Sequence, residues 1–232
     1  MNPTALGVGA LAVVAMVGCG NGGPVNSPVA PATTVAAPLT TAPAATTSSG
    51  RPAPEFALPA YGVEPTTTRA LAAGEITCPP PDGPTVTVRS PAPGSPTLTV
   101  GIPDGFAEVI PHAETVRLTG RAGLTAEVTL TPTTGDAQDA FDQYSNDRVA
   151  EFPINSVSVL PGDLCGYSGQ KLMGILADRP GKGTQYADRI VHVWTNSGDF
   201  LAAVRVEAPS GTPDFDQASS AMLADFGIAM PG

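Results

Sequence analysis

Residues 122–130 read Ala-Gly-Leu-Thr-Ala-Glu-Val-Thr-Leu, which is the clearest period-two pattern in the chain. Apolar residues occupy the even positions from 124 to 130, and Thr or Glu occupies the odd positions between them. Because successive side chains of a strand point to opposite faces, this alternation predicts a strand with one buried and one wetter face. One-sided burial of this kind is typical of antiparallel sheets.

The period changes directly after this strand. Apolar residues at 137, 140, 141 and 144 have helical spacing, Asp136 suits the N-cap, and Pro153 ends the pattern, so a helix is predicted over 136–151. A second helix is predicted over 214–226, where one face carries Phe215, Ala218, Met222, Leu223 and Phe226.

Further strands are predicted around these elements, at residues 85–89, 98–102, 156–160, 170–177, 185–195 and 200–207. The order is therefore strands, a helix, four strands and a helix. Antiparallel hairpins with segregated helices indicate the α+β class, with an antiparallel sheet of about six strands flanked by helices.

The N-terminus carries an apolar run over residues 6–18, shorter than the roughly 20 residues that cross a bilayer. It ends in Met16-Val-Gly-Cys19, which resembles the bacterial lipobox. We expect residues 1–18 to be a lipoprotein signal peptide, and Cys19 to be lipidated and to anchor the exported chain on the outer face of the cell membrane. Met16 stands where Leu is usual, and no Lys or Arg precedes Arg51. The alternative is an ordinary secreted protein with a chance cysteine.

Residues 19–81 are dense in Pro, Thr, Ala and Ser, and sixteen of the 26 prolines lie between Pro24 and Pro96. Such a tract has few large apolar groups to offset its ordering entropy, and proline favours extended conformations. We expect a disordered, semi-rigid linker that precedes a globular domain over 82–232. Phe56, Leu58 and Tyr61 interrupt the tract; they either dock on the domain or are solvated.

The net charge of the chain limits which classes of partner it can bind. Twenty-one acidic residues against eleven basic ones give a net charge of −10, which disfavours a nucleic-acid partner. It also disfavours electrostatic adhesion to an anionic membrane, so the membrane link is expected through lipid on Cys19.

Two further cysteines, Cys78 and Cys165, form an even pair that favours a disulfide in an exported chain; two free thiols are the alternative. The two histidines, His112 and His192, have no ligand spacing to a cysteine, so neither a metal site nor a cofactor is expected.

The sequence contains no nucleophile–base–acid set, so a protein without enzymatic activity is expected. Ser168, in Gly-Tyr-Ser-Gly, lacks the Gly-x-Ser-x-Gly spacing of a nucleophile elbow. His192 is either a sheet residue or a pocket residue with a general-base role, and Trp194 is either core or a pocket floor. The predicted ligand-binding residues are Phe106, Met173, His192 and Trp194, in an apolar groove for an acyl chain or glycolipid.

Two motifs carry a family resemblance. Residues 98–106 read Leu-Thr-Val-Gly-Ile-Pro-Asp-Gly-Phe, and residues 126–136 read Ala-Glu-Val-Thr-Leu-Thr-Pro-Thr-Thr-Gly-Asp. With the lipobox and stalk, the chain resembles the mycobacterial LpqN/LpqT lipoproteins, which include a proline-rich antigen, over residues 85–226. Phe106 stands where that family often has Trp.

The resemblance implies a Mog1/PsbP-like α/β/α sandwich without a known catalytic set, and cell-envelope work linked to trehalose mycolate trafficking and host-protein contact. We therefore expect an envelope lipoprotein that binds a lipid, a glycolipid or an envelope transport protein. The alternatives are a surface or secreted antigen or adhesin that contacts host proteins, and an envelope hydrolase with an unrecognised site.

Overall fold

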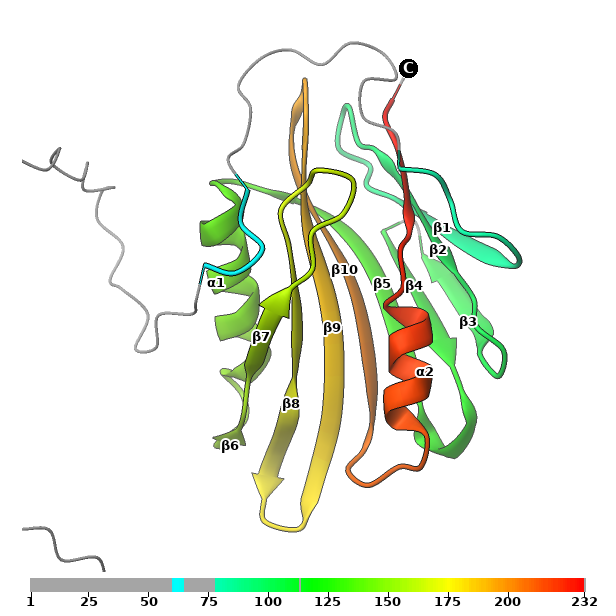
Figure 1. Cartoon of the computed structure of the whole chain (residues 1–232), viewed down its shortest axis with the longest axis vertical. Helices are drawn as coiled ribbons and strands as arrows, with labels where there is room; N and C mark the ends of the chain where they lie inside the picture. Colours follow the sequence, from blue (N-terminus) through cyan, green and yellow to red (C-terminus); the bar gives the residue numbers. More distant parts are fainter. Residues whose placement is uncertain (1–59, 65–77, 113, 232) are drawn as a thin grey trace, which may run out of the picture. The chain divides into compact units, whose positions relative to one another are not determined.

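The computed structural model describes residues 60–64, 78–112 and 114–231, all within one compact unit over 50–232 (Figure 1). The predicted lipidation site and signal peptide lie outside the described residues, as do Phe56 and Leu58. The elements are β1 (Thr85–Arg89), β2 (Thr97–Gly101), β3 (Ala107–His112), β4 (Thr115–Thr119), the 3₁₀ helix η1 (Arg121–Gly123), β5 (Thr125–Thr133), α1 (Ala137–Val149), β6 (Ile154–Asn155), β7 (Ser158–Pro161), β8 (Gly169–Arg179), β9 (Lys182–Thr195), β10 (Gly198–Pro209), α2 (Phe215–Met222) and β11 (Gly227–Ala229).

The strands form two antiparallel sheets, which confirms the predicted α+β class. The larger sheet has the order β3-β4-β5-β10-β9-β8-β6, with β7 also pairing with β8, and the smaller sheet has the order β1-β2-β11. The described residues thus hold an eight-stranded sheet and a separate three-stranded one, where the sequence predicted a single sheet of about six strands. The first two predicted strands belong to the smaller sheet.

Two predicted boundaries shift for identifiable reasons. The strand expected from residue 122 begins at Thr125, because residues 121–123 form η1 and Ala122 has a positive φ of 54°. The helix expected to reach 226 ends at Met222, and the chain then enters β11. The alternation holds from Thr125 to Leu130, where the even positions are buried and the odd positions are more exposed.

The larger sheet has a hydrophobic core on each face. On one face, α1 packs through Ala137 and Phe141 against Leu172, Tyr186 and Ile190 of the sheet. On the other face, α2 and the smaller sheet pack against β4, β5 and β10. The result is the predicted layered arrangement, with α1 on one side of the sheet and α2 with the smaller sheet on the other (Figure 1).

A buried charged cluster fixes α1 on its face of the sheet. The Arg148 guanidinium donates to the Asp188 carboxylate at 2.9 Å and to Glu207, and the Tyr144 hydroxyl also donates to Asp188 at 2.9 Å. Arg148 lies 4.6 Å from the ring centroid of Tyr186. Burial raises the pKa of Asp188, and the Arg148 charge opposes that shift. Because the charged and aromatic partners come from α1, β9 and β10, the cluster locks the helix to two strands.

Residues 60–64, which we call the strap, dock on the domain. The Gly169 N–H donates to the Gly62 carbonyl at 2.8 Å, and the Gln170 amide donates to the Tyr61 carbonyl at 2.9 Å. The Ser168 hydroxyl accepts from the Glu64 N–H at 2.7 Å and donates to the Glu64 carbonyl at 3.0 Å.

Val63 packs against the core under α1, and the strap lies beside that helix (Figure 1). The strap, which falls within the linker predicted over 19–81, is therefore held against the domain. Its anchoring is mainly through backbone groups, while the Tyr61 side chain stays exposed.

Gly62 is the one strap residue whose identity the contacts require. It has a φ of +72°, and a β-carbon there would lie 1.8 Å from the Gly169 carbonyl oxygen. We expect Gly62→Ala to release the strap, because the αL conformation alone costs a non-glycine residue about 1–3 kcal/mol and the contact is with backbone. Hydrogen exchange of the Glu64 and Gly169 amides should then accelerate.

Gly83→Ala is the matched control for this variant. Gly83 has a φ of +89°, but no atom lies within 4 Å of its added β-carbon. It carries the backbone strain without the clash, so it should leave the Glu64 and Gly169 amides protected. Equal protection of both amides in Gly62→Ala and wild type would contradict the docking.

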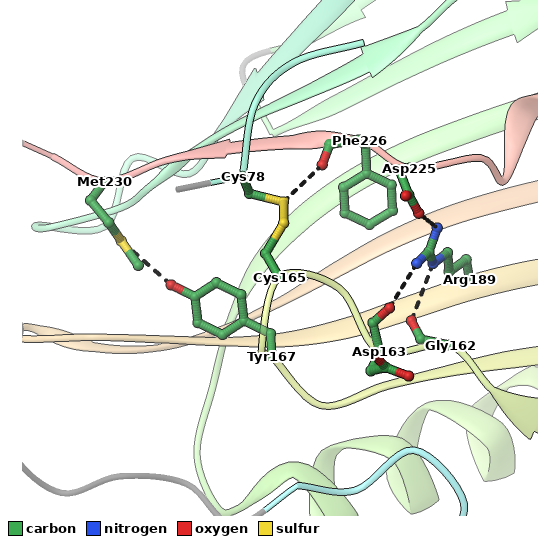
Figure 2. Close-up of a disulfide and its surroundings, with 9 residues drawn as sticks. All are labelled: Cys78, Gly162, Asp163, Cys165, Tyr167, Arg189, Asp225, Phe226 and Met230. Atoms are coloured by element: carbon green, nitrogen blue, oxygen red, sulfur yellow. Dashed lines mark hydrogen bonds and ion pairs between the residues drawn. A yellow bond between two sulfur atoms is a disulfide. The ribbon is translucent and has the colours of Figure 1, made fainter. Parts of the chain in front are cut away.

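The loop between β7 and β8 is stapled to the C-terminal segment at two points (Figure 2). Cys78 and Cys165 form a disulfide, the pairing predicted from the sequence, and the backbone of Cys78 also forms an isolated β-bridge with Ile228 of β11. Arg189 of β9 is buried and donates to the carbonyls of Gly162, Asp163 and Leu223 at 2.9–3.2 Å.

Arg189 also pairs with Asp225 at 2.8 Å and lies 5.4 Å from the centroid of the Phe226 ring. Since Leu223 is the C-cap of α2, the guanidinium binds the negative end of the helix dipole. Arg189 therefore sets where α2 ends, and with it one wall of the groove described next.

Candidate ligand groove

A groove of about 510 Å³ lies between three segments that are distant in the sequence. They are the turn after β2, the 3₁₀ helix η1 with Leu124 directly after it, and one side of α2 with the two residues before it. Its volume falls within the roughly 300–1,000 Å³ of typical small-molecule sites. The lining residues are Pro103, Asp104, Gly105, Phe106, Arg121, Ala122, Leu124, Pro213, Asp214, Gln217, Ala218 and Ala221.

The walls of the groove are apolar because of how α2 is oriented. Phe215 and Met222 of this helix are buried in the core, which leaves the small residues Ala218 and Ala221 to line the groove. Phe106 faces them from the opposite wall, packed on the same core. A β-carbon at position 120 would lie 3.3 Å from the Phe106 ring, so glycine there lets the ring lie against η1.

Strained backbone gathers at this groove. Three non-glycine residues with positive φ occur in the described part of the chain, and two of them, Ala122 with φ 54° and Asp214 with φ 60°, line it. Each such residue costs of order 1–3 kcal/mol, and residues of this kind cluster at binding and catalytic sites. Gly105 adds a third left-handed position, with φ 93°, where the turn requires it.

The rim of the groove carries charges of both signs. Arg121, Asp104 and Asp214 are exposed there, and Gln217 lies on the first turn of α2. Asp214 is the N-cap of α2, yet its side chain makes no capping hydrogen bond. Its exposed carboxylate can accept a hydrogen bond from a ligand in the groove. An apolar floor with mixed donors and acceptors at the rim suits a ligand that has an apolar body and a hydroxyl-rich head.

Of the four predicted ligand residues, the structure places Phe106 in this groove and the other three elsewhere. Met173 is exposed on β8, whereas His192 and Trp194 of β9 are buried at 1% and 9% exposure. Trp194 packs edge-on against the Tyr167 ring, with 6.1 Å between centroids, and so belongs to the core. The four residues form no common pocket, because Met173 and His192 face opposite sides of the larger sheet.

His192 is buried, and neither of its ring nitrogens has a hydrogen-bond partner among the residues that the structure describes. Burial lowers its pKa, while Asp199, the backbone of Gly135 and Asp136 act in the opposite direction. The Gly135 backbone favours the protonated form of the His192 imidazole, although it makes no hydrogen bond of good geometry with either ring nitrogen. A neutral imidazole enclosed in this way is not positioned to exchange protons with a ligand in the groove.

Two structural absences apply to the described residues alone. Among residues 60–64, 78–112 and 114–231, no group of His, Cys, Asp and Glu is arranged to hold a metal ion. In the same part of the chain, no helix has the length and hydrophobicity needed to cross a membrane.

Sequence reasoning missed Arg121, Asp214 and the small residues of α2. In the sequence, Asp104 belongs to a family motif and follows a predicted strand, and Asp214 begins a predicted helix. These positions are about a hundred residues apart, and no local pattern shows that they meet. The unusual backbone at Ala122 was hidden, because the residue belongs to an alternating stretch.

Comparison with known proteins gives likenesses of fold. No family model and no curated protein matches the sequence. The crystal structure of LpqN, involved in cell envelope biogenesis of Mycobacterium tuberculosis, is similar with a TM-score of 0.49 and 19% identity, covering 63% of this chain and 91% of LpqN. The Saccharomyces cerevisiae Ran-binding protein Mog1p is similar with a TM-score of 0.40 and 12% identity, covering 56% of this chain and 88% of Mog1p.

Proposed function

We propose that this chain is an envelope lipoprotein without enzymatic activity, whose groove binds a glycolipid. The observation that carries the proposal is the groove itself, with an apolar floor of Phe106, Leu124 and Ala218 below a rim of Arg121 and Asp214. Each methylene that an acyl chain buries contributes roughly 0.8 kcal/mol. The rim groups donate to and accept from sugar hydroxyls, which a bare hydrocarbon would not use.

The arrangement of the hydroxyl and imidazole groups supports binding over hydrolysis. The Ser168 hydroxyl is occupied by the backbone of Glu64, and the His192 ring is enclosed below α1. Neither group lines the groove. A hydrolase would need a nucleophile and a base within hydrogen-bond reach of the bound substrate.

The binding test uses the full chain and palmitoyl trehalose below its critical micelle concentration, followed by calorimetry. Ala221→Trp fills the groove, so we expect affinity to fall at least about tenfold, because the indole takes the space of several methylenes. Ser220→Trp is the matched control: Ser220 is the preceding residue, is exposed and lies outside the groove lining. It should bind like wild type.

Two results would contradict the glycolipid proposal. One is equal affinity in Ala221→Trp and Ser220→Trp. The other is the absence of both binding heat and co-purified lipid, which would favour an antigen or adhesin that contacts proteins.

The location of the chain is a separate prediction. Cys19→Ala removes the thiol on which an acyl anchor would be built, so the protein should move from the envelope fraction to the medium. Detergent partition of both forms measures this. A Cys19→Ala chain that stays in the detergent phase like wild type would show that lipid on Cys19 is not the anchor.

A further inference from the structure

Large exposed apolar side chains gather at one edge of the larger sheet. Ile154, Leu160, Met173 and Ile175 are 42%, 48%, 40% and 47% exposed, and they lie on β6, β7 and β8. Tyr61 of the strap is the fifth large apolar residue that is exposed among the described residues. Contiguous exposed apolar groups on a soluble domain mark an interaction surface.

The strand register places these four side chains on the same face. Met173 and Ile175 are two residues apart on β8, and cross-strand pairs also point to one side of a sheet. Leu160 pairs with Lys171, and Ile154 pairs with Ala177, both of which share the face of Met173. We call this surface the β8 outer face. On this side of the sheet α2 packs on β10, and β8 lies two strands further toward the sheet edge (Figure 1).

Three cations border the β8 outer face. Lys171 adjoins Leu160, while Arg179 and Lys182 pair across the β8–β9 hairpin end. Arg179 and Lys182 also line a hollow of about 700 Å³ whose floor includes Ile154 and Ile175. Lys171 and Lys182 are the only lysines in the sequence, and within the described ranges none of the three cations forms an ion pair.

We propose that the β8 outer face seats the domain on an anionic lipid surface. Aliphatic side chains enter the headgroup boundary, while the flanking Lys and Arg reach anionic headgroups with their flexible stems. The net charge of −10 means that most other surfaces are repelled by the same membrane. The charge distribution thus turns the β8 outer face toward the membrane, even though the whole chain is acidic. This proposal does not depend on ligand binding in the groove.

The test places an environment-sensitive fluorophore on Ser158→Cys in the full chain. Ser158 is exposed and pairs with Met173, so the label lies on the β8 outer face. Vesicles contain phosphatidylcholine alone or with phosphatidylglycerol, and both carry a quencher on the acyl chains. We expect quenching with the anionic vesicles only, and loss of quenching at high salt.

Charge reversal supplies the decisive comparison. Arg179→Glu with Lys182→Glu should weaken partition onto anionic vesicles roughly tenfold or more. Arg89→Glu with Arg117→Glu makes the same change of net charge at exposed positions on β1 and β4, and should retain the quenching. Groove affinity, measured by calorimetry, should be equal in both variants, so failure of this proposal is distinguishable from failure of the glycolipid site.

Three results would overturn the proposal: no quenching on any vesicle, equal quenching on neutral and anionic vesicles, or equal loss in the two charge-reversed variants. The fluorescence of the label could also change without lipid and in proportion to protein concentration. That result would show that the β8 outer face contacts a second copy of the chain instead of a membrane.

Discussion

We expect Arg189→Met to lower the free energy of unfolding by about 3 kcal/mol or more, because several acceptors around this buried side chain lose a charged donor. Methionine fills a similar volume but donates no hydrogen bond. The carbonyls of Gly162, Asp163 and Leu223 then lose their donor, and an unsatisfied buried acceptor costs about 1–3 kcal/mol. Denaturant unfolding, followed by the fluorescence of Trp194, measures the loss.

Two further variants separate the geometry of this site from its charge. Asp225→Asn removes only an exposed carboxylate, since Asp225 is 86% exposed, and should cost at most about 1 kcal/mol. Arg189→Lys keeps the charge but lacks the planar fork that reaches several acceptors, and should behave like Arg189→Met. An unfolding midpoint unchanged in Arg189→Met would show that the guanidinium does not hold the loop to the end of α2.

Removing the disulfide should have an effect of similar size. The cysteines are separated by 87 residues, and closing a loop of that length restricts the unfolded chain by roughly 4 kcal/mol in the chain-entropy model. We expect Cys78→Ala with Cys165→Ala to lose about 2–5 kcal/mol of stability. Reduced wild type should unfold at the same denaturant concentration as the double variant, because both lack the same cross-link.

Peptide mapping under non-reducing conditions provides the independent check on the disulfide. Alkylation of Cys78 and Cys165 without prior reduction would contradict the bridge. Both staples tie the same loop to the C-terminal segment, so their losses should not add. Arg189→Met made in the disulfide-free background should therefore cost less than in wild type.

The elements that were predicted well are those with strong local patterns. The period-two run of β5 and the helical spacing after Asp136 each point to one structure, and Asp136 indeed accepts from the Asp139 N–H at 3.0 Å. Four strands of the described residues were not predicted, namely β3, β4, β6 and β11. β3 contains Pro111 and a register shift, and β6 and β11 have only two and three residues, too few to show a period.

The groove could be predicted only in part, since its walls come from three separate segments. Phe106 was identified because it is aromatic and follows a turn, whereas Arg121 and Asp214 have no local signature. The sequence held one unused signal. Asp188 and Arg189 are adjacent charges within the buried, mostly apolar stretch 186–194 of β9, and alternation places their side chains on opposite faces. Each is the centre of a polar cluster, one under α1 and one beside α2.

The order of attachments at the N-terminal side gives the domain a defined response to mechanical load. Tension applied through the N-terminal part of the chain reaches the strap first, where its hydrogen bonds can open one after another and dissipate work. The load then arrives at Cys78, where it passes through a covalent bond to the loop before β8. Strands β1 and β2 of the smaller sheet lie inside the loop that this disulfide closes, so the load bypasses them. We therefore expect tension to open the strap before the domain, while the disulfide prevents β1 to β7 from being pulled out one strand at a time.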